Sequence, residues 1–135
     1  MCFRLASEND TTKIAEEPIV VYKHGIRSLI AFWPTYRDFR YLKWKPTNKV
    51  QLRIRSCGIS EGYHAYTELT RAAMWKKSKE SLGVFIIPPK ISHYRNNWDA
   101  EVVSESLIYF GSIYNPLTWI GVWTYKTYCK WTTRK

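Results

Sequence analysis

Short apolar runs that end at glycine or proline recur along this chain, and they constrain its fold more than any other feature. The runs are residues 19–22, closed by Gly25, residues 29–33, stopped by Pro34, and residues 84–87, ended by Pro88. Runs of this length, rich in β-branched and aromatic residues, are typical of buried strands. Residues 101–110 predict one or two more strands.

Two further segments alternate with period two. Residues 50–55 alternate apolar and polar residues without a fault, which predicts a strand with Arg53 and Arg55 facing solvent or a ligand. Residues 119–131 place most of their large rings at odd positions, which predicts a terminal strand with a stripe of Trp and Tyr on one side. Such a stripe is more often core than an exposed platform, and both alternatives stay open.

One helix is predicted between Thr67 and Gly83. Thr67 fits the N-cap, Glu68 and a cluster of lysines suit the two ends of the helix dipole, and Gly83 fits the stop. Small residues such as Ala72 indicate that this helix lies close against a sheet. The predicted fold class is therefore α+β, a strand-rich single domain of about six strands with one main helix packed on the sheet.

The 135 residues fit one domain of common size. Polar residues 1–17 predict an N-terminal arm, and residues 18–135 a single globular domain. Three widely separated cysteines without a C-x-x-C pair favour a reducing compartment and predict neither a disulfide framework nor a zinc site. No apolar stretch is long enough for a membrane span, so we expect a cytoplasmic protein with no membrane partner, no metal and no cofactor.

Charge and aromatic content point to an anionic partner. The net charge is +10, and 16% of the residues are aromatic. Phosphates attract cations while bases stack on rings, so nucleotides, nucleic acid or an acidic host protein are the expected partners. The chain lacks the glycine-rich, zinc-protease and serine-hydrolase motifs. The leading hypothesis is therefore a non-catalytic binding protein, and a structural or interaction module is a further alternative.

Basic residues and rings interleave most densely in residues 36–45. This mixture suits a nucleotide or single-strand binder, although an edge strand with rings inward and charges outward would have the same pattern. Gly58 and Gly62 allow close backbone approach near the predicted helix start, which would attract an anion. The predicted ligand-binding residues are Arg37, Arg40, Tyr41, Lys43, Trp44, Lys45, Arg53, Arg55, His64 and Tyr66. In residues 63–66, one alternating pair should face the core and the other a pocket.

Three stretches carry a resemblance. They are residues 16–23 (EEPIVVYK), residues 57–66 ending in EGYHAY with Ala72 and Ala73 behind them, and Ile87-Pro88 before Tyr94. Together they resemble a group of small uncharacterised proteins from phages and gut bacteria that begin Met-Cys and carry an E-G-[FY]-H-[SA]-[FY] element. This resemblance implies a phage-encoded protein in a host cytoplasm and brings no established activity.

A fainter resemblance is to the ADP-ribosyltransferase fold. His24-Gly25 follows the first strand, residues 62–67 precede a helix, and Glu101 or Glu105 lies late, in the order of those families. The resemblance implies an NAD-consuming transferase as the alternative function. His24 would then hold the nicotinamide ribose, Tyr63 would stack on the ring, and Glu105 would polarise the ribose.

Overall fold

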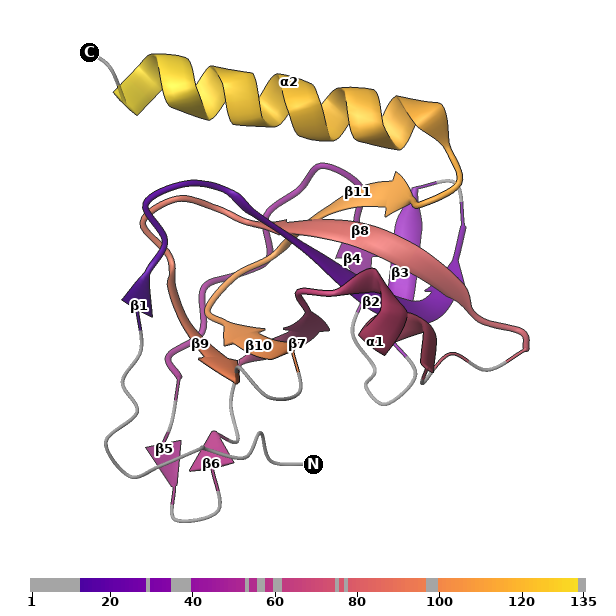
Figure 1. Ribbon diagram of the computed structural model, residues 1–135, viewed down its shortest axis with the longest axis horizontal. Coiled ribbons are helices and arrows are strands. Elements are labelled where there is room, and N and C mark those ends of the chain that lie inside the picture. The colour runs from indigo at the N-terminus through magenta and orange to yellow at the C-terminus, as the bar shows by residue number, and fades with distance from the viewer. Residues whose placement is uncertain are drawn as a thin grey trace.

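The computed structural model describes residues 13–28, 30–34, 40–52, 54–55, 58–59, 62–74, 76, 78–96 and 100–133. Its strands are β1 (Lys13–Ile14), β2 (Ile19–Arg27), β3 (Ala31–Pro34), β4 (Tyr41–Leu42), β5 (Ile54–Arg55), β6 (Gly58–Ile59), β7 (Tyr63–Tyr66), β8 (Ser81–Ile87), β9 (Ser92–Asn96), β10 (Glu101–Ser104) and β11 (Ile108–Ser112). The helices are α1 (Leu69–Met74) and α2 (Pro116–Thr133) (Figure 1). Nine strands form one antiparallel sheet, while β5 and β6 pair separately. The α+β class is confirmed, with more strands than predicted.

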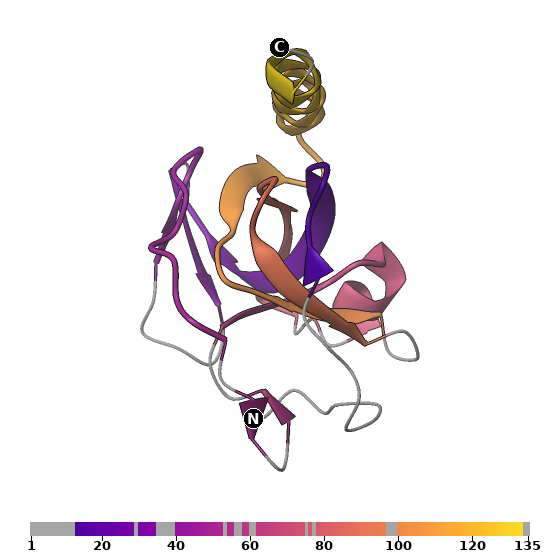
Figure 2. The same cartoon turned by 90° about the vertical axis from the view of Figure 1, so that its left-hand side faces the viewer.

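Strand β2 is the centre of the sheet. One of its edges pairs with β8 over residues 19–25, and the other pairs with β7 at Tyr22 and with β3 over residues 25–27. The chain then continues from β3 to β4, and a bridge between Lys43 and Tyr109 brings β4 beside β11. Because β11 also pairs with β8, strands β2, β3, β4, β11 and β8 close into a ring (Figure 2).

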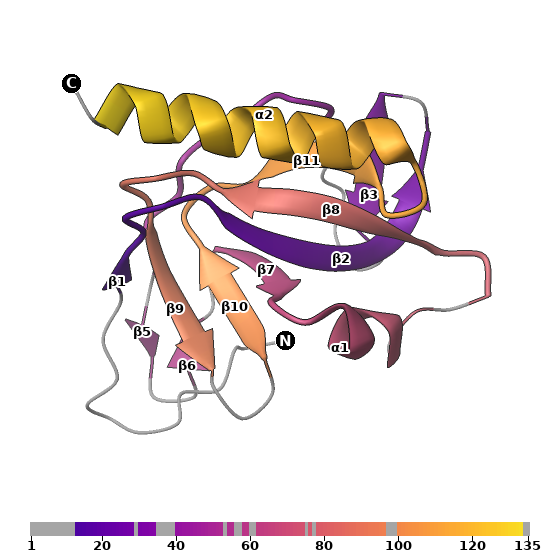
Figure 3. The ribbon, with the colours of Figure 1, turned by 45° about the horizontal axis from the view of Figure 1, so that its top comes forward.

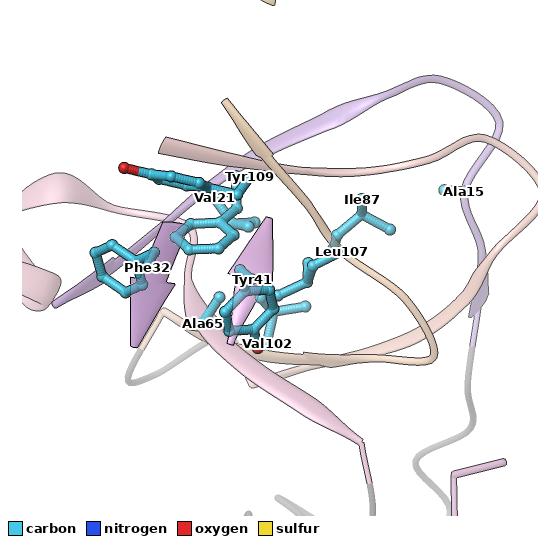
Figure 4. Packing of buried hydrophobic residues seen from close by; sticks show 10 residues of the cluster. Ala15, Val21, Phe32, Tyr41, Ala65, Ile87, Val102, Leu107 and Tyr109 are labelled. Atoms are coloured by element: carbon cyan, nitrogen blue, oxygen red, sulfur yellow. The ribbon is translucent and has the colours of Figure 1, made fainter. Parts of the chain in front are cut away.

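Four aromatic rings fill the inside of this ring of strands. The Phe85 centroid lies 4.9 Å from that of Tyr41 and 5.1 Å from those of Phe32 and Tyr109. Figure 4 shows Phe32, Tyr41 and Tyr109 converging between the strands. Aromatic pairs at these separations stabilise a core beyond the area that they bury. Some of the many aromatic residues of the chain therefore form its hydrophobic core and are not available to bind a ligand.

Helix α2 builds a second layer on the outside of the sheet. Strand β8 sends Phe85 and Ile87 into the ring core and Val84 and Ile86 outward, so both faces of the strand are buried. Val122 of α2 packs with these outward residues, and the helix crosses β8 and β11 (Figure 3). This two-sided burial explains why residues 84–87 are apolar at every position.

The terminal strand predicted over residues 119–131 is wrong, because this segment lies in α2. The Asn115 side-chain oxygen accepts a hydrogen bond of 3.0 Å from the Leu117 N–H, and Pro116 occupies the first helical position, so the start is capped. Thr118, Val122, Tyr125 and Cys129 are spaced by three and four residues, and they form the face that α2 turns toward the sheet.

The predicted helix between Thr67 and Gly83 is also wrong in extent. Helix α1 ends at Met74, and Gly83 lies within β8. A Cβ at Gly83 would stand 3.0 Å from the Phe32 ring, so this glycine makes room for an aromatic side chain and does not stop a helix. The main helix is α2.

Two other predictions change at their edges. Among the described residues of 50–55, Ile54–Arg55 form a strand and residues 50–52 do not. The Val50 N–H donates to the Glu105 carbonyl oxygen at 3.0 Å. Residues 1–12 of the predicted arm lie outside the described part. Ala15, in contrast, is buried in the core next to β1.

Candidate ligand-binding surface

Residues 40–50, named here the basic segment, form the most cationic stretch that the structure describes near the ring of strands. The segment contains Arg40, Lys43, Lys45 and Lys49 and no acidic residue. Its backbone is fixed along the neighbouring chain: the Trp44 N–H donates to the Tyr109 carbonyl at 2.7 Å, and the Thr47 N–H to the Leu107 carbonyl at 3.0 Å. The segment is therefore a fixed edge that carries exposed charges.

Trp44 is the unusual residue of the basic segment. Its φ of 65° lies in the left-handed region, which costs a residue with a Cβ about 1–2 kcal/mol, and its side chain is 64% exposed. The Lys43 ammonium stands 5.0 Å from the centroid of the Trp44 ring, within the range of a cation–π contact. A bulky ring held outward on a strained backbone, with a cation over it, is typical of a binding position.

Two glycines lie where this turn, β11 and α2 meet, and only Gly111 has no space for a Cβ. A Cβ at Gly121 of α2 would stand 3.8 Å from Trp44 Nε1. Gly111 has a φ of 132°, and a Cβ there would lie 2.5 Å from Thr118 Oγ1 and 3.6 Å from Lys43 Cε. Sequence reasoning missed both glycines, because their surroundings depend on α2, whose residues 119–131 were predicted to form a strand.

Only some of the predicted ligand-binding residues lie on the same surface. Arg40, Lys43, Trp44 and Lys45 share the basic segment. Tyr41 is instead 3% exposed within the ring core, so it cannot stack on a ligand, and this corrects the prediction.

The other predicted ligand residues lie elsewhere. Arg37 and Arg53 are outside the described residues, and of Arg55 only the place in β5 is described. In β7, Tyr63 and Ala65 face the core, which confirms the predicted alternation. His64 and Tyr66 therefore belong to the opposite face, where His64 Nδ1 lies 3.5 Å from Glu101 Oε1. Helix α1 has only six residues, too few for the predicted anion site at a helix start.

The three residues implied by the transferase resemblance have separate surroundings. His24 Nδ1 lies 3.1 Å from Glu80 Oε2, the Tyr63 hydroxyl donates to the Asn48 carbonyl at 2.8 Å, and Glu105 Oε1 accepts the Ser92 N–H at 2.9 Å. His24 shares a face of β2 with Tyr22, which packs in the outer layer, whereas Tyr63 packs against the ring core. His24 and Tyr63 therefore face opposite sides of the sheet, and NAD binding stays an untested prediction.

A cleft of about 190 Å³ lies beside the C-terminal half of α2. It is lined by Glu16, Glu17, Pro18, Pro89, Lys126, Cys129 and Lys130. Its volume is below the roughly 300–1,000 Å³ of common small-molecule sites. The cleft is therefore smaller than a nucleotide pocket, and side chains of both charges line it.

The structure gives two negative findings for its described residues. They contain no group of three His, Cys, Asp or Glu side chains placed to hold a metal ion. Neither helix in this part of the chain has both the length and the apolar character needed to cross a bilayer.

No family model, curated protein or solved structure matches this chain.

Proposed function

We propose that this protein is a non-catalytic binding protein that takes single-stranded nucleic acid along the basic segment, with Trp44 stacking on one base. The observation that carries the proposal is the Trp44 ring, exposed on a left-handed backbone with the Lys43 ammonium over it. Ring and cation together match the two halves of a nucleotide, the base and the phosphate.

A single strand fits this surface better than a duplex or a free nucleotide. The bases of a duplex are stacked on each other, so one ring that projects from a turn can stack only on an unpaired base. Cations lie on both sides of Trp44 in the sequence, at Arg40, Lys45 and Lys49, which favours a run of phosphates over one phosphate group. A host cytoplasm, as the phage resemblance implies, is the compartment that suits this function.

Fluorescence anisotropy of a labelled oligothymidylate tests the proposal. The wild type should bind, and Trp44→Ala should weaken binding about fivefold or more, since stacking on one base contributes about 1–3 kcal/mol. The matched control is Trp33→Ala, which removes another exposed ring, from β3, and should leave the affinity unchanged. Absence of wild-type binding, or equal losses in both variants, would contradict the proposal and favour a protein partner.

A further inference from the structure

The outward half of α2 exposes large apolar side chains along the whole helix. Trp123 and Trp131 are 68% and 69% exposed, and Leu117, Ile120 and Tyr128 are exposed to a similar degree. These five residues are named here the outer face. Scattered exposed apolar residues are ordinary, but five on one helix form a continuous patch of the kind that marks an interaction site.

The spacing of the helix separates this face from the buried one. Ile120, Trp123, Thr127 and Trp131 follow one another at intervals of three or four residues, so they share one side of α2. Residues 118, 122, 125 and 129 have the same spacing and form the side that packs on the sheet. The side of α2 that carries Ile120, Trp123 and Trp131 therefore points away from the sheet.

Several polar side chains of α2 already have hydrogen-bond partners within the protein, so little free energy is lost if water is removed from them. The hydroxyl groups of Thr124, Thr127 and Thr132 donate to carbonyl oxygens one turn earlier, at 2.8, 2.9 and 3.0 Å. The Trp119 indole N–H donates to the Ile113 carbonyl at 2.9 Å. A hydroxyl that is already bonded within its helix loses little when water is removed.

Helix α2 carries positive charges and no negative ones. Lys126 and Lys130 are exposed on the flank next to Trp123, and the helix contains no acidic residue. Glu105 is the last acidic residue of the whole sequence. Glu16 and Glu17 line a cleft with the same two lysines, but they lie outside the helix. A partner that combines negative charge with apolar depth therefore fits α2 itself best.

We propose that the outer face of α2 docks on the surface of an anionic lipid bilayer, with the helix lying in the plane of the interface. Trp and Tyr favour the headgroup level, while Leu117 and Ile120 can enter the acyl boundary and the lysines can reach lipid phosphates. Such binding needs no helix able to cross the membrane. The proposal departs from the expectation of no membrane partner, because that expectation considered only spanning segments and took residues 119–131 for a strand.

Other occupants fit the outer face less well. Nucleic acid gains nothing from exposed Leu117 and Ile120, since stacking and phosphate pairing use rings and cations. A second copy packed through α2 would bring the two Lys126–Lys130 pairs of both helices together without an acidic residue on either helix. The inference does not depend on nucleic-acid binding by the basic segment.

Vesicle co-sedimentation of the full chain tests the inference, with vesicles of phosphatidylcholine alone and of phosphatidylcholine mixed with phosphatidylserine. The wild type should sediment with the anionic vesicles and much less with the neutral ones. Trp123→Ser combined with Trp131→Ser should weaken the anionic binding about tenfold or more. Lys126→Gln combined with Lys130→Gln should weaken it by a similar factor, since each lysine near an anionic surface contributes about 1 kcal/mol.

Arg40→Gln combined with Lys45→Gln is the matched control, because it removes the same charge from the basic segment. This variant should keep vesicle binding and weaken oligothymidylate binding, while the α2 variants should do the reverse, so failure of either proposal is seen separately. Circular dichroism checks that each variant is folded, and the lysine variant tests the inference even if the tryptophan variant unfolds.

Three results would overturn the inference. One is no binding of the wild type to anionic vesicles, or binding that neither α2 variant changes. Another is a wild-type dimer that the tryptophan variant dissociates, without vesicle binding, which would assign the outer face to a second copy. The last is loss of oligothymidylate binding in the α2 variants, again without vesicle binding, which would assign it to nucleic acid.

Discussion

The indole nitrogen of Trp44 lies 3.8 Å from the position that a Cβ would take at Gly121, so the turn and α2 meet at the only residue of the helix without a side chain. The nearest atom to that Cβ is Phe110 Cδ2 at 3.5 Å, which is an ordinary van der Waals contact. The site therefore has room for a methyl group.

Gly121→Ala should stabilise the protein by up to about 1 kcal/mol, because alanine favours the helix interior over glycine by that amount. Urea unfolding measures the change. Gly25→Ala is the control: its Cβ would stand 2.4 Å from the Trp33 carbonyl oxygen, so this variant should be destabilised. A loss of stability in Gly121→Ala as large as that in Gly25→Ala would show that α2 docks differently.

Replacement of Trp44 separates stability from binding. Trp44→Gly relieves the left-handed backbone, whereas Trp44→Ala keeps it, so the glycine variant should be about 1 kcal/mol more stable than the alanine variant. Both should weaken oligothymidylate binding about fivefold or more, because neither keeps the ring that stacks on a base. Equal unfolding free energies of the two variants would contradict the positive φ at this position.

His93 makes stability depend on pH. Burial lowers the pKa of this histidine from its ordinary value near 6.5; the positive charges of Arg95 and Lys13 act in the same direction, and a hydrogen bond to the Ile91 backbone opposes them. The unfolded chain then binds the proton more readily, so stability is complete above about pH 6.5 and falls as the pH drops from there toward the lowered pKa.

His93→Gln cannot titrate, and its urea midpoint should fall less than that of the wild type between about pH 7.5 and about pH 5. Both proteins contain the same other titrating groups, so the difference between their changes in urea midpoint reports on His93 alone. A steeper fall in the variant would mean that the folded state favours the protonated His93.

Glu16, Glu17, Lys126 and Lys130 line the same cleft beside α2. If these lysines contact an anionic bilayer, the two carboxylates oppose binding, and Glu16→Gln combined with Glu17→Gln should raise the affinity for anionic vesicles severalfold. Glu68→Gln, an exposed site before α1, is the control for a change of one unit in net charge, so it is compared with Glu16→Gln and Glu17→Gln taken singly. An equal gain in the control would show that overall charge, and not the position beside α2, governs binding.

The strands that could be predicted are those whose pattern is local and unambiguous. Residues 19–22 and 84–87 are apolar at consecutive positions and are bounded by turn residues, and both fall within strands. Residues 101–110, predicted as one or two strands, contain β10 and the start of β11. Residues 119–131 failed, because rings spaced by four residues satisfy both period two and the helical period. The Asn115–Pro116 cap was the signal that would have decided between them.

The candidate surface could be predicted only in part. The interleaved sequence of residues 36–45 identified Lys43 and Trp44, but it could not show that Tyr41 turns inward. That orientation follows from ring contacts with Phe85 and Tyr63, which come from distant parts of the chain. The approach of Gly121 to Trp44 is likewise a long-range contact, and the outer face of α2 is visible only once the helix is known.

The salt dependence of oligothymidylate binding tests the central claim, that the basic segment binds a single strand through its phosphates. For the wild type, the logarithm of the affinity should fall linearly with the logarithm of the salt concentration, by about 0.7 for each phosphate contacted. Replacing Arg40, Lys45 and Lys49 by glutamine should reduce that slope by about 2. A slope that stays the same in the triple variant would contradict the account.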